Sequence, residues 1–238
     1  MVFLFTTLLL GAGLPAVVPN DLLEQERAIA RQFESRVHIA ALPFQPHLPR
    51  IRIETRPSIS YFDGETIREA RFNELPSPVQ AIFNQWAADT RDQPSGEKLF
   101  ADMFYRFFFV HELGHWVTGQ VISNRYDSGK QAASDNMKHN HWRTELECNR
   151  ISVAWWRERD PTYLAKLMAD FNAIEKKLPN PVPAGQSKEE YFATNYERLG
   201  EDPQVYGWFL LQSAMDAYSE PPKSFQQVLN ELPNATFR

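Results

Sequence analysis

The chain has 238 residues, of which 43% are hydrophobic and 13% aromatic, so a disordered protein is excluded and a domain with a substantial core is expected. The formal net charge is −5 and the sequence shows no basic stripe, which argues against a nucleic-acid partner. The single cysteine, Cys148, excludes an intrachain disulfide and a cysteine-rich zinc site.

The first residues of the chain bear on whether the protein is exported from the cell. Met1–Val18 has no charged side chain, but it is short for a membrane span and two glycines and a proline interrupt it. It is typical of the apolar core of a signal peptide, although no Lys or Arg opens it and no clean A-x-A cleavage site follows. We predict a signal peptide over residues 1–19 and an exported protein, periplasmic or secreted. Membrane contact is expected only through an uncleaved N-terminal segment; a buried apolar segment is the alternative.

The rest of the chain, 20–238, is predicted to be one domain of the α+β class, mostly helical. Asp63-Gly64 between two apolar runs indicates a two-residue hairpin, so a small antiparallel sheet is expected over about 50–72. Ser95 and Gly119 are the expected N-cap and C-cap of a long, mostly buried helix. Apolar spacing predicts helices at 21–38, 78–89, 97–120, 138–159, 162–178, 189–199, 203–218 and 224–232, with a polar loop at 124–137.

The long helix carries the strongest functional signal, His-Glu-Leu-Gly-His at 111–115. Residues four apart lie on one helix face, so His111 and His115 can present their imidazoles to one metal ion. Glu112 can reach a water bound to that metal. Two neutral imidazoles and a carboxylate suit zinc with a fourth position left for water, and the pattern H-E-x-x-H is typical of metal-assisted hydrolysis of a peptide bond.

A third protein ligand is needed, and the helix predicted at 138–159 offers several. Glu145, Cys148, Asn149 and Ser152 stand at the positions of a pattern close to E-x-x-A-N-x-x-A. In this the chain resembles the gluzincin metallopeptidases, whose third ligand is a glutamate on a helix after the H-E-x-x-H helix. The resemblance implies Glu145 as the third ligand, one zinc ion per chain and a zincin-like core over about 50–157, with a helical C-terminal part at 158–238.

Two other residues compete with Glu145. Glu147 points about 200° around the helix from Glu145, so only one of the two can face the metal. His141 lies one turn before Glu145 on the same face and is either a ligand or a hydrogen-bond donor to the reacting oxygen. Asn149, one turn after Glu145, is a candidate hydrogen-bond partner of the ligands.

The mechanism that follows uses Glu112 as general base, passing a proton from the metal-bound water to the leaving amine. Candidate donors to the developing oxyanion are His141, Arg143 and Tyr206. Cys148 lies mid-helix in a packing position and is read as a small apolar residue rather than a nucleophile. The resemblance also implies that a peptide or protein substrate lies extended along an edge strand of the sheet.

The sequence thus predicts an exported zinc metallopeptidase. A peptide deformylase shares H-E-x-x-H but requires a cysteine ligand upstream, whereas Cys148 is downstream. A catalytically inactive zinc-bearing binding or regulatory protein is the alternative of another class, and a metal-free helical domain is a third.

Overall fold

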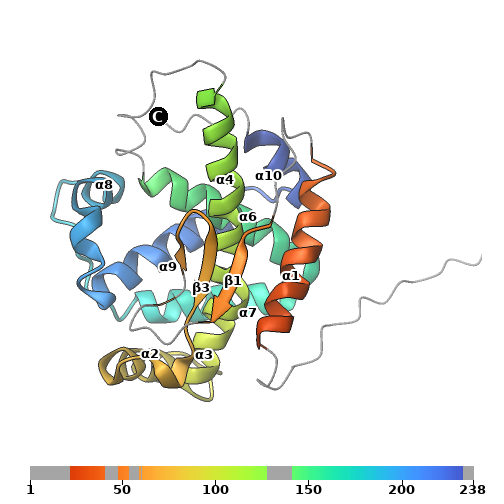
Figure 1. Ribbon diagram of the computed structural model, residues 1–238. Helices are drawn as coiled ribbons and strands as arrows, with labels where there is room; N and C mark the ends of the chain where they lie inside the picture. The colour runs from red at the N-terminus through yellow and green to blue at the C-terminus, as the bar shows by residue number, and fades with distance from the viewer. Residues whose placement is uncertain (1–21, 41–47, 54–58, 60, 128–140, 233–238) are drawn as a thin grey trace, which may run out of the picture.

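Figure 1 shows the computed structural model, which describes residues 22–40, 48–53, 59, 61–127 and 141–232. The predicted signal peptide and residues 128–137 of the predicted polar loop lie outside these ranges. None of the helices in the described part of the chain combines the length and the apolarity that a membrane crossing requires.

The β region is a three-stranded sheet in the order β1-β3-β2. The last two strands form the predicted antiparallel hairpin, but β1 pairs in parallel with β3, so the sheet is mixed and the prediction of a purely antiparallel sheet was wrong. A parallel pair requires the chain to cross over between β1 and β2, and the alternation within a strand carries no information about such a crossover. The strands are β1 (Arg50–Ile53), β2 (Tyr61–Phe62) and β3 (Thr66–Glu69).

The hairpin turn lies one residue later than predicted. The strand register pairs Phe62 with Ile67, and the N–H of Asp63 donates to the carbonyl of Thr66, which leaves Gly64 and Glu65 as the two turn residues. Gly64 has a φ of +98°, a conformation that favours glycine. The Asp63 carboxylate accepts from the N–H groups of Glu65 and Thr66, at 3.0 and 2.8 Å, and so holds the turn.

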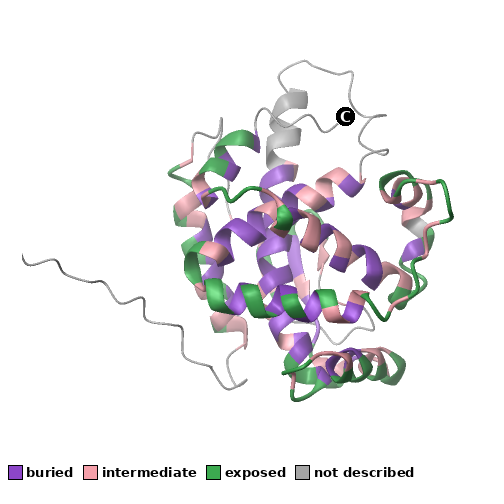
Figure 2. Ribbon diagram, turned by 180° about the vertical axis from the view of Figure 1, so that it is seen from behind, coloured by how far each residue is buried: buried purple, intermediate pink, exposed green. Residues whose placement is uncertain are grey.

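The remaining described elements are helical, which confirms the mostly helical α+β class. The helix that carries H-E-x-x-H, α4, lies between the sheet with α1 on one side and α6 on the other (Figure 1). Buried residues are concentrated on these central helices (Figure 2). The helices are α1 (Leu22–Val37), α2 (Ser77–Asp89), α3 (Gly96–Asp102), α4 (Phe109–Asp127), α6 (His141–Arg159), α7 (Pro161–Glu175), α8 (Lys188–Leu199), α9 (Pro203–Ser219) and α10 (Phe225–Glu231), with a short 3₁₀ turn, η2 (Phe72–Glu74).

The predicted long helix is continuous from Gly96 to Asp127 but contains a π-helical segment, η3 (Met103–Phe108), between α3 and α4. Ser95 caps its start as predicted, accepting from the N–H of Lys98 at 3.1 Å. Gly119 does not end it, because α4 runs on to Asp127 and the glycine lies inside the helix. A glycine inside a helix costs only about 1 kcal/mol, so it does not by itself stop one.

The helices α4 and α6 approach closely beside the metal-binding motif. A Cβ on Gly114 would lie 3.1 Å from Cα and 3.2 Å from Cβ of Cys148, so the small residues on both helices permit the approach. Ser152 and Trp156 of α6 donate to the carbonyls of Phe107 and Arg106 in the π-helical segment, at 2.7 and 3.1 Å. These bonds fix α6 against the helix that carries the two histidines.

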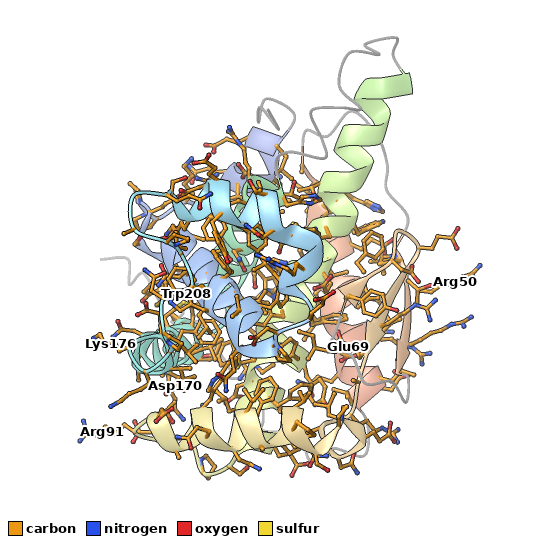
Figure 3. The ribbon with its side chains drawn as sticks, turned by 90° about the vertical axis from the view of Figure 1, so that its left-hand side faces the viewer. Arg50, Glu69, Arg91, Asp170, Lys176 and Trp208 are labelled. Carbon is orange, nitrogen blue, oxygen red and sulfur yellow. The ribbon has the colours of Figure 1, made fainter. Side chains whose placement is uncertain are left out.

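Two glutamate side chains are buried on the side of α4 that faces the sheet and α1. Glu26 of α1 is fully buried, and neither of its carboxyl oxygens has a hydrogen-bond partner within the described structure. Glu69 of β3, labelled in Figure 3, is 1% exposed. Burial raises the pKa of Glu26 well above its usual value, and burial together with the charges of Glu26 and Glu112 does the same for Glu69.

Replacing Glu26 by glutamine is therefore expected to stabilise the folded protein relative to wild type, by an amount that grows as the pH rises. A carboxyl whose folded pKa is raised binds its proton more tightly in the folded state, so wild-type stability falls as the pH rises from about 4.5 toward the folded pKa. Glutamine does not titrate, so the variant should gain about 1–3 kcal/mol over wild type above neutral pH and little near pH 4. Urea unfolding across the pH range measures this. The same change at Glu34, on an outer part of α1, is the control, and a pH-independent difference for Glu26→Gln would contradict the prediction.

Candidate metal centre

Three side chains predicted as metal ligands converge between α4 and α6. His111 Nε2 lies 3.0 Å from His115 Nε2 and 3.1 Å from Glu145 Oε2, and His115 Nε2 lies 3.6 Å from Glu145 Oε1. His111 and Glu145 are buried, while the His115 side chain is 22% exposed. This is the only group of three or more His, Cys, Asp or Glu side chains in the described structure whose ligand atoms lie within 4.8 Å of one another.

The spacing of these atoms suits a tetrahedral metal ion. Ligand atoms at about 2.0–2.1 Å from a zinc ion lie about 3.3 Å from one another at tetrahedral angles. The three separations here, from 3.0 to 3.6 Å, bracket that value. The donors therefore fit a zinc ion with little rearrangement, and the partial exposure of His115 leaves one side from which water or substrate can enter.

A hydrogen-bonded chain fixes the protonation of His111. The Ser213 hydroxyl donates to the carbonyl of Leu210 at 3.1 Å, so its oxygen accepts from the Asn149 amide nitrogen at 2.8 Å. The Asn149 carbonyl oxygen then faces His111 Nδ1 at 2.9 Å, and Nδ1 must carry the proton. His111 Nε2 is left with its lone pair toward Glu145, which is the tautomer that a metal ligand needs. Among the candidate ligands, the hydrogen-bond partner of Asn149 is thus His111.

Replacing Asn149 by leucine is expected to weaken zinc binding by about 10–100-fold, the usual effect of losing a partner of a ligating histidine. The cause would be the loss of the acceptor that holds the proton on His111 Nδ1. Competition with a chromophoric chelator measures the affinity. Asn149→Asp keeps the acceptor and should stay within a few-fold of wild type. An equal loss in both variants would mean that Asn149 acts through packing alone.

The pKa values of the side chains at the centre are set by their burial and by the charges of their close neighbours. Burial alone would lower the pKa of His115, but the Cys148 thiol and the Glu145 carboxylate outweigh it and hold that pKa well above its usual value. Burial would raise the pKa of Glu145, yet His115 and His111 hold it far below the usual range. The centre therefore carries a carboxylate that attracts positive charge. Cys148 is buried, and its Sγ lies 3.8 Å from the Thr118 hydroxyl, a contact that its packing position in the sequence did not indicate.

Glu112, the predicted general base, lies beside the ligands and against the sheet. It is 8% exposed, and its carboxylate accepts a hydrogen bond from the backbone N–H of Phe62 in β2. Burial raises its pKa, and the neighbouring histidines counteract part of that rise. The edge strand β2 thus holds the carboxylate in place.

Two tyrosines of the C-terminal helices lie near enough to the centre for the Glu145 charge to act on their pKa values. Tyr206 of α9, a predicted oxyanion donor, is half-buried, and burial and the Glu145 carboxylate raise its pKa well above 10. Tyr196 of α8 is the residue that the sequence did not reveal: burial and Glu145 raise its pKa to about 12. Neither hydroxyl has a hydrogen-bond partner in the described part of the chain, so each is available to donate. His141 stacks flat on Tyr196, with ring centroids 3.8 Å apart and planes 2° from parallel.

The competing ligand candidates lie elsewhere. Glu147 faces away from the metal centre, as its helical position predicted, and its carboxylate bonds Arg150 at 2.6 Å. Arg143, one turn earlier, lines a surface cavity together with Glu147. His141 is not a member of the converging ligand group in the described structure. The remaining histidine of this stretch, His139, lies outside the described residues.

Comparison of the chain with protein-family models, with curated proteins and with solved structures found no match in any of the three.

Proposed function

We propose that this protein is a zinc-dependent peptidase of the gluzincin type, exported by virtue of its apolar N-terminal segment. The observation that carries the proposal is the convergence of His111 Nε2, His115 Nε2 and the Glu145 carboxylate, whose atoms are 3.0–3.6 Å apart, near the tetrahedral value, with Glu112 beside them. The same three donors also suit non-haem Fe(II). The H-E-x-x-H pattern with its adjacent carboxylate favours zinc and hydrolysis.

In this proposal zinc, when bound, supplies a polarised water and a Lewis acid for the scissile carbonyl. Glu112 accepts the proton of the attacking water and delivers it to the leaving nitrogen, with the Phe62 N–H holding its carboxylate in position. Tyr206 and Tyr196 donate hydrogen bonds to the oxygen that gains charge. Asn149 keeps His111 in its ligating tautomer throughout.

The position of β2 supports a peptide as substrate. In the order β1-β3-β2 it forms one edge of the described sheet, and its Phe62 contacts the general base. An extended peptide paired with this edge would pass close to Glu112 and the ligands. Recognition through backbone hydrogen bonds would bring the scissile bond to the centre with little dependence on side chains.

Metal analysis tests the proposal first. The purified protein is dialysed against metal-free buffer, its zinc and iron are measured, and it is then incubated with a mixture of unstructured peptides whose products are identified by mass spectrometry. About one zinc per chain and cleavage that a chelator stops and zinc restores are the expected results. Absence of zinc even after reloading would refute the proposal, and stoichiometric iron would replace it with a non-haem iron protein.

Replacing Tyr206 by phenylalanine should lower kcat by about 100-fold, the effect of removing one oxyanion donor, and leave zinc content unchanged. The reason is that only the hydroxyl is lost while the half-buried ring stays. Tyr196→Phe, measured alongside, shows which of the two hydroxyls contributes more. Tyr218→Phe serves as the control because its ring packs against Arg157 instead of the centre. Unchanged kcat in both site variants would remove the tyrosines from the mechanism.

A further inference from the structure

Four arginines gather in a groove between α1 and β1. Arg27 and Arg31 are one helical turn apart on α1, and Arg50 and Arg52 share one face of β1. Together they line a cavity of about 430 Å³, which we call the basic groove, and none of the described residues that line it is acidic. Its other walls are apolar: Ala30, Leu48, Pro49 and Ile51.

The charge of the groove is largely uncompensated. All four arginines are exposed, and only Arg27 has an ion pair in the described structure, with Glu24 at 2.6 Å. The side chains of Arg31, Arg50 and Arg52 have no carboxylate or hydrogen-bond partner there. A chain with a formal net charge of −5 therefore concentrates positive charge at one place. Like charges held close without counter-ions are unfavourable, so a bound anion would relieve their repulsion.

We propose that the basic groove binds a phosphoryl group, either in the headgroup of an anionic phospholipid or in a free phosphate. The planar guanidinium of arginine pairs with two phosphate oxygens at once and is weakly hydrated, so arginine suits phosphate better than lysine does. The apolar walls can contact the carbon atoms that adjoin a headgroup phosphate. A nucleic acid needs a basic surface that follows many phosphates along a strand, and this single groove on an acidic chain does not provide one.

The groove lies away from the proposed peptidase edge. In the sheet order β1-β3-β2, Arg50 and Arg52 belong to one edge strand and Phe62, beside Glu112, to the other. Arg50 extends from the side of the molecule opposite Arg91 and Lys176 (Figure 3). In the sequence, α1 follows closely after the apolar stretch Met1–Val18. A lipid surface that holds this stretch would therefore have the groove within reach.

Vesicle binding of the full chain tests the proposal. Sedimentation is compared with vesicles of phosphatidylcholine alone and with vesicles that also contain phosphatidylglycerol, so that binding by the apolar stretch is common to both. We expect a preference for phosphatidylglycerol that Arg31→Gln/Arg52→Gln lowers by about 20-fold at low salt. Arg91→Gln/Lys176→Gln removes the same charge from exposed residues on the opposite side and should keep the preference. Thermal unfolding checks that both variants are folded.

A second arm separates the two sources of phosphate. Inorganic phosphate binding is measured by calorimetry on wild type and on both variants. Phosphate binding that only Arg31→Gln/Arg52→Gln abolishes, without a vesicle preference, would support the groove with free phosphate as its ligand. An equal loss in both double variants, or no loss in either, would overturn the proposal. So would binding of heparin through these arginines without binding of phosphatidylglycerol or phosphate. None of these readouts depends on zinc or on peptidase activity.

Discussion

Replacement of Glu112 by glutamine is expected to lower kcat by about 10³-fold while the protein keeps its zinc. Glutamine has nearly the shape of glutamate but cannot accept the proton of the attacking water. His111, His115 and Glu145 are untouched, so the metal should remain. The measurement is kcat on a cleaved peptide with the zinc content of the same sample.

Folding is not expected to confound this result. Glu112 is 8% exposed and burial raises its pKa, so a neutral side chain at this position is tolerated in the core. Full activity in the variant would exclude Glu112 as the base. If wild type cleaves no peptide, and both proteins bind one with the same affinity, the catalytically inactive zinc-bearing protein becomes the better description.

The part of the site that the sequence predicted rests on helical periodicity. His111 and His115 are one turn apart, and Glu145 and Glu147 point to different sides of α6, so short-range spacing was enough to place them. The choice between the two glutamates also followed from the side that carries Cys148, Asn149 and Ser152. All three of these residues are fully buried.

Contacts between distant segments could not be predicted in this way. The charge of Glu145 acts on Tyr196 of α8, and Ser213 of α9 fixes the orientation of Asn149 on α6. Asn149 lies on the same helix face as Glu145, but the ligand with which it forms a hydrogen bond is His111 on the neighbouring helix, 2.9 Å away. Such pairings depend on how helices pack, which a single sequence does not specify.

The parallel pairing of β1 with β3 and the basic groove were both missed by the sequence analysis, because both depend on contacts between segments that are apart in the chain. Arg27 and Arg31 precede Arg50 and Arg52 by about twenty residues, so no window of the sequence contains a basic stripe. The contact between α1 and β1 brings the four together. Counting charged residues along the sequence therefore does not reveal a cluster of arginines that forms only when distant segments pack together.

The choice of Glu145 over Glu147 leads to the second large effect. Glu145→Gln should weaken zinc binding by more than about 100-fold, beyond the loss that an outer hydrogen-bond partner causes, because it removes the only charged ligand of the centre. Glu147→Gln is the matched control two residues away on the same helix. It should leave zinc affinity unchanged, because its carboxylate bonds Arg150 and not the histidines.

Chelator competition on the two variants also tests the geometry from which the proposed function starts. Both are Glu→Gln changes at buried positions of α6, so their effects on charge and helix propensity are alike. A selective loss in Glu145→Gln can then arise only from the side of the helix that each residue faces. Equal zinc affinity in both variants would mean that the convergence of Glu145 with His111 and His115 is a hydrogen-bonded cluster without a metal. In that case the peptidase proposal would lose its main support.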